Sequence, residues 1–204
     1  MLFVMKLSMS DLKIKIQPDF LIVLAFAVII VPAPWLIAWL VAALIHESFH
    51  FMALKICGCK ISYFCVGVYG ASITAVMPSG FQTILCSAAG PMAGFLLLTI
   101  TRVVPRIAVC GMIQSLVNLL PIYPLDGGRV ILEVVSLFLE RNKAEKLCVW
   151  LEWIIIFAIL MVLCYAVYRY NLGIMPVVVV FVFLIQKKYL ANHKPRRYNI
   201  HNRK

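Results

Sequence analysis

The feature that most constrains this chain is a His-Glu-x-x-His motif, His46 to His50, inside a strongly apolar segment. Residues four apart lie on one face of an α-helix, so His46 and His50 can point their imidazoles at a single zinc ion. Glu47 can then reach a water molecule bound to that metal. The flanking segments, 35–44 and 51–54, have the composition of a membrane helix. Ionisable groups are costly in such a setting, so the motif predicts a functional site.

The composition indicates a polytopic membrane protein. Of the 204 residues, 64% are hydrophobic and 13% are charged, whereas a soluble domain is about half apolar and a quarter charged. No cleavable signal peptide is expected, because the first nineteen residues are mixed and polar. We predict an all-α membrane domain over residues 1–186, with about six transmembrane helices. The expected spans cover residues 20–34, 35–56, 81–101, 106–124, 147–168 and 171–186.

Residues 61–77 differ from the apolar spans. This segment is rich in Ile, Val, Tyr, Phe and Thr, and Gly67 and Gly70 interrupt it. Such a composition predicts a short re-entrant β-hairpin after the second span. Backbone of this kind at membrane depth is tolerated only against protein or a water-filled cavity.

The basic residues predict the orientation in the membrane. The net charge is +11, and the tail at residues 187–204 contains seven Lys and Arg residues and no acid. Because the tail follows an apolar run, we interpret it as a cytoplasmic anchor rather than a nucleic-acid-binding segment. With both termini in the cytoplasm, sixteen of the 19 Lys and Arg residues lie inside, and only Arg102, Arg106 and Arg169 lie outside. That bias favours a multi-pass topology with two cytoplasmic termini.

The seven cysteines lie mostly inside or beside apolar runs. We expect them to be small packing residues in the membrane rather than disulfide partners. Cys57-Gly58-Cys59 could also form a metal site, although two thiolates alone are weak evidence for one.

The predicted topology brings a candidate third ligand to the motif. The second and fourth spans both run towards the cytoplasm, so Asp126 emerges at the same inner side as His46 and His50. Two histidines and one carboxylate leave an open coordination position for water, as in catalytic zinc sites. Glu47 would be the general base and then the proton donor to the leaving amine. Two alternatives remain: Asp126 could cap the turn before Gly127, and the motif could be a polar helix face packed in a bundle.

The two motifs together resemble those of the site-2 protease family of intramembrane zinc metalloproteases. The residues that carry the resemblance are His46-Glu47-Ser48-Phe49-His50 and, about seventy residues later, Asn118-x-x-Pro121-x-x-Pro124-Leu125-Asp126-Gly127-Gly128. Within the family, the chain is most similar to the small stage IV sporulation protein FB type. Two features depart from the pattern. Gly94 stands where the family often has Asn, and only residues 186–204 follow the last span, so neither a CBS domain nor a PDZ-like insertion is expected in this chain.

The resemblance implies a role for each site residue. It implies that His46, His50 and Asp126 bind one Zn²⁺ per chain and that Glu47 is catalytic. Asn118 would also act in catalysis, by holding the substrate backbone or the developing oxyanion. The substrate-binding residues would be Asn118, Gly70 and Pro121, with the hairpin offering a strand edge to an unwound substrate.

The predicted function is that of a zinc endopeptidase in a bacterial cell membrane, with its active site towards the cytoplasm. Its substrate would be a membrane-tethered regulatory protein, either a pro-sigma factor in sporulation or an anti-sigma factor, and membrane-embedded regulators or inhibitors are further partners to expect. The alternative is a catalytically inactive homologue that sequesters partners. An ion transporter would need ionisable groups on several spans, and beyond this site only Glu152 lies clearly within one. The sequence predicts no oligomeric state.

Overall fold

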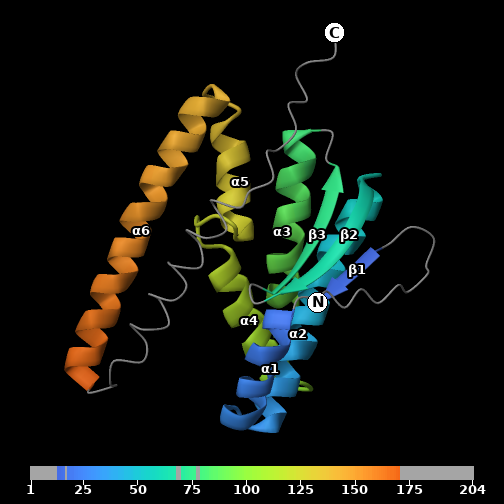
Figure 1. The fold of residues 1–204 in the computed structure, drawn as a ribbon, viewed down its shortest axis with the longest axis vertical. Coiled ribbons are helices and arrows are strands. Elements are labelled where there is room, and N and C mark those ends of the chain that lie inside the picture. Colours follow the sequence, from blue (N-terminus) through green and yellow to red (C-terminus); the bar gives the residue numbers. More distant parts are fainter. Residues whose placement is uncertain (1–12, 17, 68–69, 77–78, 171–204) are drawn as a thin grey trace. The chain divides into compact units, whose positions relative to one another are not determined.

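The computed structural model describes residues 13–16, 18–67, 70–76 and 79–170, and most of them are helical (Figure 1). The chain divides into two compact units, Met1–Glu152 and Trp153–Lys204. The described part of the second unit, residues 153–170, is helical throughout. The helices are α1 (Pro18–Ile30), α2 (Ala33–Ile56), α3 (Gly80–Leu97), the short 3₁₀ helix η1 (Leu98–Ile100), α4 (Pro105–Asn118), α5 (Asp126–Val135) and α6 (Arg141–Tyr170). The strands are β1 (Lys13–Ile16), β2 (Lys60–Gly67) and β3 (Gly70–Val76).

Within the described residues, three helical segments are long and apolar enough to cross a membrane. They are Ala33–Ile56, Gly80–Ile100 and Arg141–Tyr170, while Phe20–Ile30 is a shorter apolar helix. The prediction of a mainly helical protein with membrane-length helices is therefore confirmed. The predicted span at 171–186 and the basic tail at 187–204 lie outside the described residues.

The fourth predicted span differs from the structure at its end. Helix α4 stops at Asn118 instead of continuing to residue 124, and the chain then turns before α5 begins. Pro121 and Pro124 account for this difference, because proline has no backbone N–H and disfavours the helical conformation in the residue before it. The turn that results is what brings Asp126 back towards the helices.

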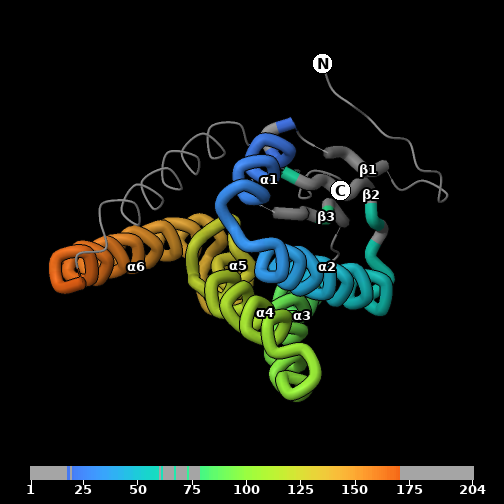
Figure 2. The backbone as a smooth tube through the Cα atoms, turned by 90° about the horizontal axis from the view of Figure 1, so that it is seen from below, coloured from blue at the N-terminus to red at the C-terminus, as the bar shows by residue number. Residues whose placement is uncertain are grey.

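Three helices of the first unit pack around α3. Helix α3 contacts α2, α4 and α5, and α2 also contacts α4; the view in Figure 2 shows α2, α3 and α4 side by side. A side chain at Gly94 would overlap the Ser115 hydroxyl and the carbonyl of Gly111, so Gly94 allows the close crossing of α3 and α4. The Gln114 amide donates a hydrogen bond to the Trp39 carbonyl at 2.9 Å, which ties α4 to α2.

The three strands form one sheet in the order β1-β2-β3. Strands β2 and β3 are antiparallel, with Gly67 opposite Gly70 at the turn between them. Strand β1 pairs in parallel with β2, from Lys13 opposite Tyr63 to Ile16 opposite Val66. The sequence did not predict β1, because four alternating residues are too short a pattern. In the described part of the chain, β1 covers one edge of β2, and β3 is the other outer strand.

Candidate metal centre

The structure brings together three side chains that are far apart in the sequence. His46 and His50 lie one turn apart on α2, and Asp126 is the first residue of α5. The Nε2 atoms of the two histidines are 3.1 Å apart. The Oδ2 atom of Asp126 lies 3.3 Å from His46 Nε2 and 3.1 Å from His50 Nε2. Among the described residues, these three make up the one group of ligand-type side chains arranged to hold a metal ion.

The size of this triangle fits a tetrahedral metal ion. Zinc binds nitrogen and oxygen ligands at about 2.0–2.2 Å, which at tetrahedral angles separates neighbouring ligand atoms by about 3.3–3.5 Å. The three distances in the structure, 3.1 to 3.3 Å, are close to those values. Two imidazoles and one carboxylate also form a donor set suited to catalytic zinc, with a fourth position left for water or substrate. The residues present therefore fit a zinc ion.

A hydrogen bond from α3 orients one of the histidines. His50 Nδ1 lies 2.6 Å from the backbone carbonyl oxygen of Cys86, so the Nδ1–H donates to that oxygen. This bond fixes the tautomer and leaves the lone pair of His50 Nε2 facing the metal position. His46 Nδ1 is buried and has no hydrogen-bond partner among the described residues. Its Nε2 atom faces Asp126.

Asp126 reaches the site because two glycines follow it. A side chain at Gly127 would overlap the backbone carbonyl of Leu119, and one at Gly128 would lie 2.6 Å from the carbonyl carbon of Ile122. The first turn of α5 can therefore press against the chain that leaves α4. Burial alone would raise the pKa of the Asp126 carboxyl, but its contacts with His46 and His50 outweigh burial and lower that pKa to about 2. The carboxyl group is thus ionised at neutral pH, as a metal ligand must be.

The backbone of α3 also lies directly against the ligands. A Cβ atom at Gly90 would overlap His50 Nε2 and would lie 2.6 Å from His46 Nε2. Real Cβ atoms do not approach other atoms this closely, so any side chain at this position would displace the two imidazoles or occupy the metal position. Gly90 therefore keeps space for a metal ion between the two imidazoles and α3.

Glu47 lies beside the triad and is half-buried. Its carboxyl group interacts electrostatically with His50, Asp126 and Arg129. Arg129 lies one turn after Asp126 on α5 and interacts with both carboxylates. The neighbourhood of the candidate metal position thus contains the carboxylate of the triad, the second carboxylate of Glu47, and a nearby cation.

The other predicted site residues lie on neighbouring elements. Asn118 is the last residue of α4 and is half-buried. Pro121 lies in the turn between α4 and α5. Gly70 is the first residue of β3. Among the described contacts, none of these three makes a hydrogen bond to the histidines or to Asp126, so their roles in substrate binding stay predictions.

Two groups that contribute to the site, the Cys86 carbonyl and Gly90, are not predicted by the sequence. The Cys86 carbonyl is a backbone group, which carries no signal in the sequence. Nothing in the sequence around Gly90 indicates that the histidines lie against it. The cysteine sulfurs themselves take no part in the triad: Cys59 and Cys86 are free thiols buried with Leu54, and Cys57 packs against them.

The comparisons with known proteins give one similarity in fold. No described protein family matches the chain, and neither does any curated protein sequence. Among solved structures, the chain is similar to the Site-2 Protease from Methanocaldococcus jannaschii, with a TM-score of 0.61 and 17% sequence identity. The similarity covers 89% of this chain and 91% of that chain. The fold is therefore that of a site-2 protease, and together with the apolar helices it points to a membrane protein.

Proposed function

We propose that this chain is an intramembrane zinc endopeptidase. The observation that carries the proposal is the triangle of His46, His50 and Asp126, with Glu47 beside it. Both histidines and Glu47 lie on α2, a helix long enough to cross a membrane. Buried ionisable groups in such a helix are costly unless they are paired or bind a ligand. The shared fold with a site-2 protease supports the same reaction class.

The chemistry follows from the positions of the side chains. His46, His50 and Asp126 would hold a zinc ion, which supplies Lewis-acid activation of water and of the peptide carbonyl. Glu47 accepts a proton from the attacking water and then donates it to the leaving amine. The hydrogen bond from His50 to Cys86 keeps the imidazole in the required tautomer throughout. Arg129 offsets the negative charge of the two carboxylates.

The substrate side of the proposal rests on two features. Strand β3 is an outer strand of the sheet within the described residues, so its free backbone groups can pair with an extended substrate segment. An apolar cavity of about 190 Å³ lies between α2 and α3 and suits an aliphatic substrate side chain. Its lining residues are Phe49, Met52, Ala53, Ile56, Ala89 and Met92, two of which directly precede His50 and Gly90. Both features favour a membrane segment that has unwound near the metal.

The finer proposal concerns the biological setting. The substrate is a membrane-tethered regulator, a pro-sigma factor or an anti-sigma factor, as in the stage IV sporulation protein FB type. The enzyme crosses a bacterial membrane six times, with both termini in the cytoplasm and the metal centre towards that side. The charge distribution supports this orientation. Asn118 and Pro121 lie in and after the last turn of α4, where they would contact the substrate backbone.

The test compares the wild-type protein with Glu47→Gln and His46→Ala, each purified and mixed with a reporter that carries a membrane segment. Glu47→Gln keeps all three ligands and should bind zinc stoichiometrically, while cleavage falls roughly 100- to 10,000-fold. His46→Ala should lose both zinc and cleavage. Undiminished cleavage by Glu47→Gln would refute the mechanism. Wild-type protein that holds zinc but cuts no membrane-tethered sigma or anti-sigma factor would favour the sequestering homologue instead.

A further inference from the structure

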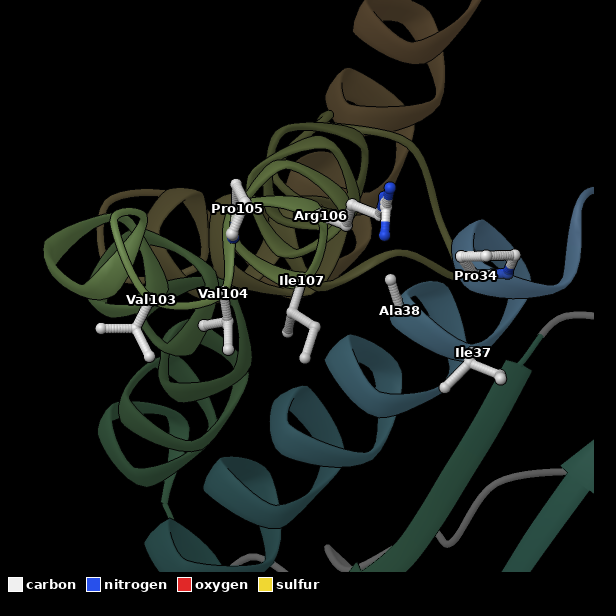
Figure 3. A pocket seen from close by; sticks show the side chains of 8 residues that line it. All are labelled: Pro34, Ile37, Ala38, Val103, Val104, Pro105, Arg106 and Ile107. Atoms are coloured by element: carbon white, nitrogen blue, oxygen red, sulfur yellow. The ribbon is translucent and has the colours of Figure 1, made fainter.

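A second cavity lies at the other end of α2 from the metal centre. It has a volume of about 270 Å³ and opens between the start of α2 and the chain that enters α4. Pro34 lines it and stands twelve residues before His46, a distance of about 18 Å along a helix. The lining residues are Pro34, Ile37, Ala38, Val103, Val104, Pro105, Arg106 and Ile107 (Figure 3).

This cavity is apolar except for one cation. Seven of its eight lining residues are aliphatic or proline, and the eighth is Arg106. Figure 3 shows the Arg106 side chain extending from α4 towards Pro34 and Ala38, while Ile37, Val104 and Ile107 point to the opposite side. The cavity therefore separates a cationic part from an aliphatic part. A ligand that matches it must carry a negative group next to a hydrocarbon.

The sequence around Arg106 contains no acidic residue. Between Glu47 and Asp126 the sequence contains neither Asp nor Glu, and both of those carboxylates belong to the metal centre. No ion pair of Arg106 occurs among the described residues. Arg102, four residues earlier, does not line the cavity. The Arg106 side chain is exposed and is the one charged group of the cavity lining, so its guanidinium is available to an anion from outside the described chain.

The ends of the apolar helices place this cavity at a membrane boundary. The span of α2 begins at Ala33, and the span containing α3 ends at Ile100. The cavity lies next to both ends, at residues 34–38 and 103–107. Trp35, which is 44% exposed, stands at the same level, where aromatic residues favour the lipid headgroup region. A membrane supplies an anionic group at that depth in the phosphates of its phospholipids.

We propose that this cavity binds one anionic phospholipid, with the phosphate on Arg106 and the first part of an acyl chain against Ile37, Val104 and Ile107. A lipid held there lies between the start of α2 and the start of α4, and it ties together two helices whose other ends bear the metal ligands and Asn118. This site is independent of the peptidase chemistry and stands whether or not the chain cleaves peptides.

The test uses the full chain in nanodiscs that contain equal amounts of phosphatidylglycerol and phosphatidylcholine, with native mass spectrometry after release into detergent. The wild-type protein should retain one phosphatidylglycerol in preference to phosphatidylcholine. Arg106→Gln should lower that retention roughly fivefold, the effect of one basic residue at a membrane surface. Arg102→Gln and Arg169→Gln, which remove the same charge outside the cavity, should change it less than twofold.

A second variant tests the proposal independently by filling the cavity with a bulky side chain. Val103 is 80% exposed, so Val103→Trp can place a ring in the cavity without disturbing the core, and it should lower retention as Arg106→Gln does. Equal retention of both lipids, or equal loss in all three arginine variants, would overturn the proposal. Displacement of the lipid by millimolar inorganic phosphate would also overturn it, because the site would then recognise a free anion.

Discussion

His50 Nδ1 donates a hydrogen bond of 2.6 Å to the carbonyl oxygen of Cys86, which makes α3 part of the metal centre although it contributes no ligand. The same helix lies against the other side of the imidazoles at Gly90, one turn later. Helix α2 carries two ligands, α5 carries the third, and α3 packs against both. Three helices therefore set the geometry of the candidate metal centre, and changes in α3 should alter metal binding.

Gly90→Ala tests this role of α3. The added methyl group would overlap His50 Nε2, so zinc affinity should fall by about tenfold to a hundredfold. Cleavage should fall with it. Zinc content after dialysis against a metal buffer measures the effect. Ala89→Ser adds one atom to the neighbouring residue of α3 and should leave zinc content unchanged. A Gly90→Ala protein with wild-type affinity would show that α3 does not confine the ligands.

Removal of one ligand charge tests Asp126. Asp126→Asn keeps the size of the side chain but replaces the carboxylate with a neutral amide, so zinc binding should weaken and excess zinc should partly restore it. Isothermal titration of the metal-free protein, prepared with a chelator, measures the affinity. Glu133→Gln on the same helix is the matched control, because Glu133 pairs with Arg141 at 2.8 Å and not with the triad. Equal affinities for the two variants would contradict the assignment of Asp126.

The crossing of α3 and α4 makes a prediction about stability. The Ser115 hydroxyl is fully buried and has no hydrogen-bond partner among the described residues. Ser115→Ala removes that buried polar group, so the free energy of unfolding should stay the same or rise by about 1 kcal/mol. Gln114→Ala, one residue earlier, loses the hydrogen bond to Trp39 and should lower it by about 1 kcal/mol. Thermal unfolding in detergent measures both, and a destabilising Ser115→Ala would mean that the hydroxyl has a bound partner.

The outer edge of β3 can be tested with proline. Neighbouring residues of an antiparallel strand direct their N–H groups to opposite sides, so of Ser72 and Ile73 one faces β2 and the other faces outward. Proline at the outward position removes a donor for the substrate but spares the pairing with β2. One of the two proline variants should therefore keep the wild-type melting temperature and lose most cleavage of a membrane-tethered reporter. If every variant that keeps its melting temperature also keeps full cleavage, substrate pairing with β3 is excluded.

Helix periodicity alone predicts that His46 and His50 share one face of a helix, and the structure places their Nε2 atoms 3.1 Å apart. Asp126 could be placed beside them only by combining span directions with the charge bias, and the structure brings it to within 3.3 Å of both histidines. The predicted fourth span ends at residue 124, whereas α4 ends at Asn118. Pro121 and Pro124 in the sequence already disfavour a helix there. The contacts of Gly90 and of the Cys86 carbonyl could not be predicted, because they join a backbone to side chains thirty or more residues away.

The order of the strands limits how many segments the sheet can accept. Strand β1 occupies one side of β2, so within the described residues the two outer strands of the sheet are β1, with 4 residues, and β3, with 7. The longer edge, that of β3, takes one guest strand per chain. An extended peptide that fits β3 would compete with substrate at a one-to-one stoichiometry. Two copies of the chain that joined through their β3 strands would block each other's access, so dimerisation by this edge and proteolysis would be mutually exclusive.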